Sequence, residues 1–166
     1  MRNNAKQMAL GGIFAALAVT IMSLGGMIPL ATYVCPVLCM MLQFTVLIFC
    51  GKRTAWAWYG AVSILGLLLG PDKEAAAVFC FLGYYPIIKP RLDKMRLGLL
   101  WKAMLFNASM CIMYWLLLHL FGLEGLTEEF SELGTAMLWV LLAMGNVTFF
   151  LLDKVLILFA RKLVGR

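Results

Sequence analysis

The sequence predicts an all-α integral membrane protein, in which six transmembrane helices form one bundle with both termini in the cytoplasm. Two observations support this prediction. The chain has apolar runs of membrane-spanning length, and the charged segments that separate these runs alternate between basic and acidic. A helix needs about 20 apolar residues to cross a hydrocarbon core of roughly 30 Å. Of the 166 residues 64% are hydrophobic and the mean hydropathy is +0.95, which excludes an ordinary water-soluble domain. The runs are 7–28, 32–50, 54–70, 74–88, 99–121 and 135–158.

The charges in the breaks set the topology. Basic residues precede the first run, lie between the second and third and between the fourth and fifth, and follow the sixth. The other breaks hold Asp72, Glu74 and the acidic residues of 124–132, with Lys73 as their one cation. Because translocation of Lys and Arg is disfavoured, the basic breaks should be cytoplasmic. We therefore expect a multi-pass protein of the cell inner (plasma) membrane, with residues 1–166 forming a single transmembrane domain.

The net charge of +6 comes from these cytoplasmic breaks. Basic side chains beside the inner leaflet favour anionic membrane lipid, so nucleic-acid binding is not implied. The basic segment 89–102 can alternatively serve as a docking surface. A bundle that uses the whole chain leaves no nucleotide-binding domain, so any ATP-driven activity needs partner ATPases.

The first run carries small residues at four-residue spacing, Gly11 with Ala15 and Gly12 with Ala16. Such pairs let two helix backbones approach closely in lipid. The face they form is a candidate coupling surface for a transmembrane partner. Packing of the same residues inside the bundle is the alternative.

The second run places four of its residues on the same face as Gln43. We expect this face to point inward, because an amide at mid-bilayer depth needs partners. The four are Cys35, Cys39, Val46 and Cys50. A redox role for Cys35 and Cys39 is an open alternative, although the chain has no C-x-x-C pair and packing as small apolar residues is the simpler interpretation.

The fourth run is short and closes with Gly83 and Pro86. A short segment interrupted by glycine and proline is one sequence indicator of a transporter substrate site. In the turn before this run, Asp72 can cap the following helix. In the last run we expect Asp153 to pair with a basic residue near the inner leaflet, while Asn146 shares its face of the helix.

Aromatic residues agree with this topology. Trp56, Trp58 and Trp101 lie beside the basic breaks, and Tyr33, Trp115 and Trp139 lie toward the acidic ones, as interfacial belts. No catalytic or metal-binding motif appears, so we expect neither an enzyme nor a cofactor.

A solute site is predicted at the outer ends of the last three runs, where Lys73 is the only outer cation. Aromatic rings supply apolar area and a few polar groups fix orientation. Alternatively, Lys73 pairs with Glu74 or Glu128, and the tryptophans only anchor the interface. The candidate substrate-binding residues are Tyr33, Asp72, Lys73, Glu74, Trp115, His119, Trp139 and Asn146.

In layout, and in a first run that reads Ala9-Leu-Gly-Gly-Ile-Phe-Ala-Ala-Leu17, the chain resembles the substrate-binding S components of energy-coupling-factor (ECF) transporters. The resemblance implies a six-helix subunit that captures a vitamin or similar micronutrient outside. It also implies that the small residues of the first helix contact a transmembrane coupling subunit associated with cytoplasmic ATPases. The alternative is a structural scaffold similar to rod-shape proteins of the MreD type, which bind no solute.

Overall fold

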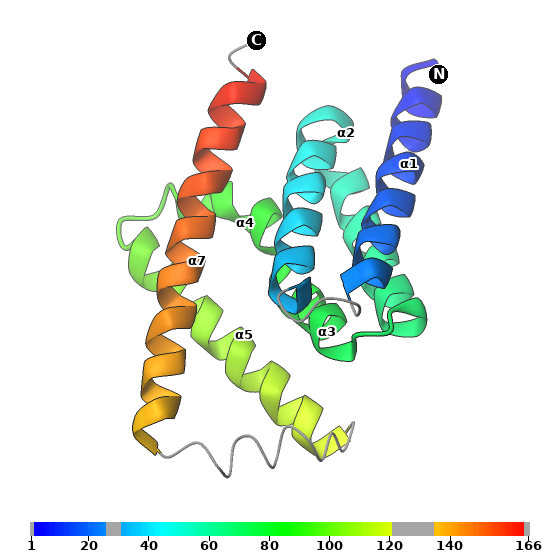
Figure 1. Ribbon diagram of the computed structural model, residues 1–166. Coiled ribbons are helices and arrows are strands. Elements are labelled where there is room, and N and C mark those ends of the chain that lie inside the picture. The colour runs from blue at the N-terminus through cyan, green and yellow to red at the C-terminus, as the bar shows by residue number, and fades with distance from the viewer. Residues whose placement is uncertain (1, 26–30, 121–134, 165–166) are drawn as a thin grey trace. The chain divides into compact units, whose positions relative to one another are not determined.

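The computed structural model describes residues 2–25, 31–120 and 135–164, which form helices joined by turns, with no strand in these ranges (Figure 1). Four helices are long and apolar enough to cross a membrane. The all-helical fold is thereby confirmed, and the chain is a membrane-embedded protein; the count of six crossings stays a prediction. The four long helices are α1 (Arg2–Gly25), α2 (Ala31–Leu69), α5 (Gly98–Leu120) and α7 (Thr135–Val164).

Two compact units make up the chain, an N-terminal unit of residues 1–96 and a C-terminal unit of residues 97–166. The N-terminal unit holds α1, α2 and two short helices, α3 (Lys73–Leu82) and α4 (Tyr85–Leu92). The C-terminal unit holds α5 and α7. A single bundle over the whole chain remains a prediction.

Helix α2 consists of two legs that meet at Gly51. This residue has φ 83° and ψ 172°, a backbone conformation that is open almost only to glycine. Figure 1 shows that α2 turns back on itself, so that its two legs lie side by side. The break falls in the gap predicted between the runs 32–50 and 54–70, where the charges of Lys52 and Arg53 lie.

Helix α1 packs against both legs of α2. Along the first leg, the thiol of Cys50 bonds to the carbonyl of Gln7 and that of Cys39 to the carbonyl of Ala18, so α1 and this leg are antiparallel. Along the second leg, Gly11 lies beside Thr54 and Gly66 beside Met22, so α1 and this leg are parallel. These contacts place the buried face of the first leg inward, as predicted from Gln43.

The segment predicted as one crossing over 74–88 is instead two short helices separated by a turn at Gly83 and Tyr84. Pro86, in the first turn of α4, lacks the amide hydrogen that a continuous helix would use at that position. At 1.5 Å per residue, the ten residues of α3 extend only about 15 Å. The expectation of one continuous helix is therefore corrected, and neither short helix crosses a membrane alone.

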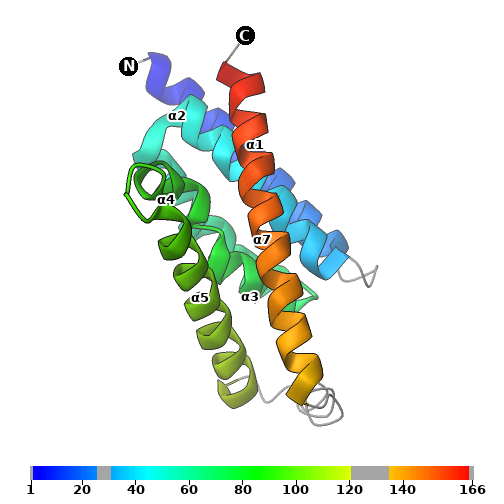
Figure 2. The ribbon, with the colours of Figure 1, turned by 90° about the vertical axis from the view of Figure 1, so that its left-hand side faces the viewer.

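Within the C-terminal unit, α5 and α7 run in opposite directions (Figure 2). They meet where the ring of Phe106 stacks on that of Phe149, with ring centroids 4.6 Å apart. Gly145 faces the same ring, where an added Cβ would make an ordinary van der Waals contact of 3.6 Å with Phe106. Away from this crossing, the helices diverge toward Leu120 and Thr135 (Figure 1).

Candidate functional site

Four of the predicted substrate-binding residues come together in the N-terminal unit. The hydroxyl of Thr32 donates to Oδ2 of Asp72 at 2.7 Å, and that of Tyr33 donates to Oε1 of Glu74 at 3.1 Å. We call the cluster of Thr32, Tyr33, Asp72, Lys73 and Glu74 the outer rim. Its bonds tie the start of α2 to the start of α3, two segments about 40 residues apart in sequence.

The charged groups of the outer rim also hold the helix ends. Asp72 is the N-cap of α3 and its Oδ1 accepts from the amide of Ala75 at 3.0 Å, which confirms the predicted cap. The ammonium of Lys73 donates to the carbonyls of Leu67 and Gly70, at 2.8 and 3.0 Å. A cation at the C-terminal carbonyls of a helix is electrostatically favourable. Lys73 is thus held by backbone carbonyls at the end of α2.

The remaining predicted substrate-binding residues belong to the C-terminal unit. Trp115 on α5 and Trp139 on α7 are exposed. The side chain of His119 lies outside the described residues, as does Glu128, which was proposed as a partner for Lys73. The structure therefore assembles one group of predicted residues around the outer rim and leaves the second group on a separate unit.

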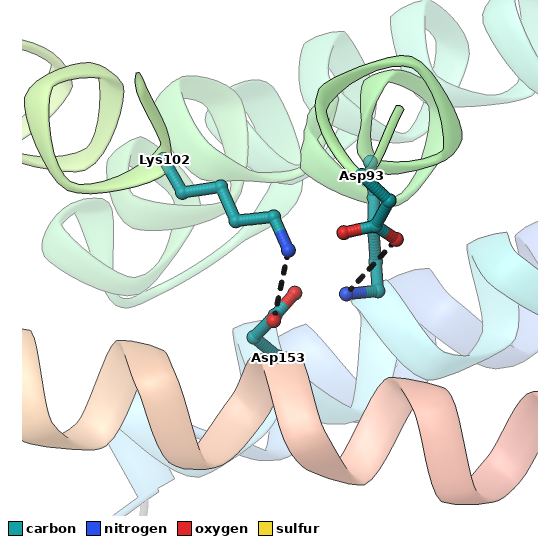
Figure 3. Close-up of polar contacts among 4 residues, drawn as sticks. Asp93, Lys102 and Asp153 are labelled. Carbon is teal, nitrogen blue, oxygen red and sulfur yellow. Dashed lines mark hydrogen bonds and ion pairs between the residues drawn. The ribbon is translucent and has the colours of Figure 1, made fainter. Parts of the chain in front are cut away.

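The C-terminal unit has a polar seam of its own, formed by Lys102, Asn107, Asn146 and Asp153. The Nζ of Lys102 lies 3.0 Å from Oδ2 of Asp153, and Figure 3 shows the ammonium pointing at that carboxylate. Both side chains are buried. The predicted pairing of Asp153 with a basic residue is confirmed, and Lys102 is that residue.

The amides of Asn107 and Asn146 form a second, reciprocal pair between the same two helices. Asn107 Nδ2 donates to Asn146 Oδ1 at 3.1 Å, and Asn146 Nδ2 donates to Asn107 Oδ1 at 3.0 Å. Asn146 also donates to the carbonyl of Leu142. The polar atoms of Asn146 are thus engaged between α5 and α7, which the sequence did not indicate because it does not show which helix faces align.

The basic segment 89–102 is not a uniform lipid-facing surface. Lys89 is buried, with its ammonium 3.6 Å from Asp93 and 5.9 Å from the centre of the Tyr85 ring. Lys102 is buried in the seam, whereas Arg91, Lys94 and Arg96 are exposed. Only the exposed group has the accessibility that contact with lipid headgroups or a docking partner requires.

The small residues of α1 divide between two faces. Gly11 is buried against Thr54, and Ala15 is half-buried. Gly12 is exposed, with open space around a Cβ added there, and Ala16 is exposed as well. Gly11 therefore serves packing within the unit, while Gly12 and Ala16 form the outward small surface.

Cysteines in α2 act as hydrogen-bond donors to α1. The sulfur atoms of Cys39 and Cys50 each lie 3.5 Å from an α1 carbonyl oxygen. Cys35, on the same leg of α2, is also buried. No cysteine of the described residues forms a disulfide. No group of three or more potential metal ligands occurs among the described residues.

Three buried side chains of the N-terminal unit have polar atoms without a hydrogen-bond partner among the described residues, and the hydroxyl of Ser63 is one of them. Gln43 is 0% exposed, with both amide atoms unpartnered, and Trp58 is 4% exposed, with an unpartnered indole Nε1. Trp58 packs edge-on against Phe79. Its assignment to a lipid-facing belt is therefore corrected, because helix packing rather than depth decides which tryptophan faces lipid.

The chain matches no protein-family model, no curated protein and no solved structure.

Proposed function

We propose that this chain is the substrate-binding membrane subunit of an energy-coupling-factor importer. In this role it captures a vitamin or similar micronutrient outside and passes it to a transmembrane coupling subunit driven by cytoplasmic ATPases. The outer rim is the observation that supports the proposal best. It gathers hydroxyl, carboxylate and ammonium groups at one end of a unit whose long helices have no charged residue in 7–25, 31–51 or 54–69.

The outer rim is suited to orienting a polar solute because its own groups are already fixed. Glu74 is held by Tyr33, and Asp72 by Thr32 and the α3 amide. Side chains that are ordered before binding lose little conformational freedom when a ligand arrives. Tyr33 adds an exposed ring on which a flat solute can stack.

The outward small surface of Gly12 and Ala16 supports the second half of the proposal. Small residues allow close backbone approach, which stabilises helix association in lipid, where apolar burial alone gives no preference for helix over acyl chain. Because these residues face away from α2, a coupling subunit can contact them without disturbing the N-terminal unit.

A scaffold role is the second candidate, and one observation favours it. The charged groups of the outer rim already have partners within the chain, and Lys73 is held by two backbone carbonyls. Such a rim can simply stabilise helix ends. A scaffold needs no solute and would display no rim-dependent binding.

Mass spectrometry of the gently purified protein separates the two candidates. The importer proposal expects a co-purifying small molecule, ATPase subunits, or both. It also expects that Glu74→Gln and Tyr33→Phe, which keep the side-chain shapes, weaken solute binding measured by isothermal titration calorimetry. Met8→Leu on the exposed part of α1 is the matched control and should bind as wild type does. Recovery of cell-wall synthesis proteins, with no solute and no ATPase, would favour the scaffold.

A further inference from the structure

The core of the N-terminal unit contains polar groups that neither its fold nor the outer rim uses. Gln43 offers two amide donors and one carbonyl acceptor, and Trp58 offers one indole donor. None of these atoms has a hydrogen-bond partner among the described residues, although both side chains are more than nine-tenths buried. Burying such groups without a hydrogen-bond partner is energetically costly, so an amide left unpaired at this depth points to a bound partner.

Contacts along α1 place these two residues at the same level. Cys50 contacts Gln7, and Cys39, eleven residues earlier, contacts Ala18, eleven residues later. Moving one residue forward along α1 therefore corresponds to moving one residue backward along the first leg of α2. Gln43 therefore lies at the level of Phe14.

The second leg of α2 is related to α1 in the same way. Gly11 lies beside Thr54 and the two helices continue in parallel to Met22 and Gly66. Four residues beyond Thr54, Trp58 lies at the level of Ala15. The two unpartnered groups thus occupy one layer of the unit, on the two legs of a single helical hairpin.

Around this layer, α1 contributes the small residues Gly11, Ala15 and Ala18, together with the half-buried side chain of Phe14. Gly11 and Ala18 are buried and Ala15 is half-buried. No charged residue occurs in 7–25, 31–51 or 54–70, the described stretches that enclose the layer. A charged ligand would lose its hydration without a counterion there, which costs far more than burial of a neutral polar group.

We propose that Gln43 and Trp58 form the polar end of an internal site, beside the small face of α1, for a small neutral molecule with adjacent N–H and C=O groups. A cyclic amide of this kind accepts from Gln43 Nε2 and donates to Gln43 Oε1, while a second carbonyl accepts from the Trp58 indole. The site goes beyond the proposed importer function, because all its groups belong to the N-terminal unit and it needs no coupling partner. Gln43 is fully buried, so ligand entry requires α1 to move away from α2, and association is slow.

The test uses the full chain in lipid nanodiscs, with uracil as the probe and 1,3-dimethyluracil as its matched control. Dimethyluracil keeps the ring and both carbonyls but has no N–H. Millimolar uracil is expected to raise the unfolding temperature of wild type, and dimethyluracil at the same concentration is not. Gln43→Leu should weaken uracil binding at least tenfold. Thr45→Val, which removes a hydroxyl bonded within the same leg, should not.

The stability of the unliganded protein provides a second readout. Gln43→Leu removes an unsatisfied amide, so the free variant should be at least as stable as wild type. Trp58→Phe keeps an aromatic ring and should reduce the uracil-induced shift without abolishing folding. If Gln43→Leu does not fold, the response of Trp58→Phe to uracil tests the proposal in its place.

Three outcomes would overturn the proposal. Uracil does not stabilise wild type, dimethyluracil stabilises it equally, or neither Gln43→Leu nor Trp58→Phe alters the uracil effect. A destabilised Gln43→Leu combined with no response to uracil would indicate that buried water alone satisfies the amide. Because these measurements use the isolated chain, loss of the importer function through a missing partner would leave their result unchanged.

Discussion

Lys102 on α5 and Asp153 on α7 form a buried ion pair, with Nζ 3.0 Å from Oδ2. Ionisable residues inside membrane-spanning helices are costly and are usually paired with one another. Here the ion pair and the paired amides of Asn107 and Asn146 fix the alignment of two largely apolar helices. The polar seam therefore specifies how α5 and α7 cross.

Breaking this ion pair should be strongly destabilising. Asp153→Ala leaves the Lys102 charge buried without its α7 partner, and we expect a loss of about 3–5 kcal/mol in the free energy of unfolding. Lys154→Ala, on the exposed neighbouring residue, should change stability by less than about 0.5 kcal/mol. Denaturant unfolding in micelles measures both.

Replacing both charges tests whether the cost comes from the unpaired ion. The double variant Lys102→Met with Asp153→Leu should recover most of the stability lost in Asp153→Ala, because apolar residues of similar volume need no counterion. A double variant as unstable as the sum of the single ones would contradict a direct interaction between the two side chains.

The break in α2 predicts opposite effects of the same substitution at two glycines. Gly51→Ala places a Cβ at φ 83° and should cost about 1–3 kcal/mol. Gly60→Ala, at a helical position with open space, should stabilise by up to about 1 kcal/mol. Equal effects at both positions, measured by thermal unfolding, would show that α2 does not turn at Gly51.

Bulky substitutions on the two faces of α1 should have different effects, on partner binding at one face and on stability at the other. Gly12→Leu and Ala16→Trp, on the outward surface, are expected to abolish co-purification of a coupling subunit while the chain keeps wild-type thermal stability. Gly11→Leu meets Thr54 and should instead lower stability. If the outward variants retain the partner in pull-down experiments, this surface is not the coupling site.

Topology follows from the charge pattern and is tested by labelling. Single cysteines at Lys94 and Glu128, in a background without reactive cysteines, should react with an impermeant maleimide from opposite sides of the membrane. Positive charge is retained inside, so Lys94 should be cytoplasmic. Reaction of both positions from one side would refute the six-crossing arrangement.

Much of the fold was predictable because bilayer thickness sets the length of an apolar run, and charged residues mark where such a run ends. The break between the second and third runs was placed correctly, since Lys52 and Arg53 interrupt an apolar stretch and Gly51 lies beside them. The fourth run was predicted less well. Its hydropathy does not show that the chain turns at Gly83 and Tyr84 and makes two short helices.

The candidate sites were predictable only where the partners are close in sequence. The Asp72 cap on α3 could be read from adjacent residues. The bonds from Thr32 to Asp72 and from Tyr33 to Glu74 join segments about 40 residues apart, and no periodicity reveals such pairs. Thr32 was therefore missed, although its place at the start of an apolar run beside Tyr33 was a usable signal.

The sequence by itself determined that this chain is helical and apolar enough to lie in a membrane, because those properties depend on the composition and order of neighbouring residues. Only the tertiary structure decided the roles of individual polar side chains. Asn146 pairs with Asn107, Lys73 holds the end of α2, and Gln43 has no partner in the described core. A polar side chain in lipid takes whichever group packing brings within hydrogen-bond distance, and packing is set by contacts between segments far apart in the chain.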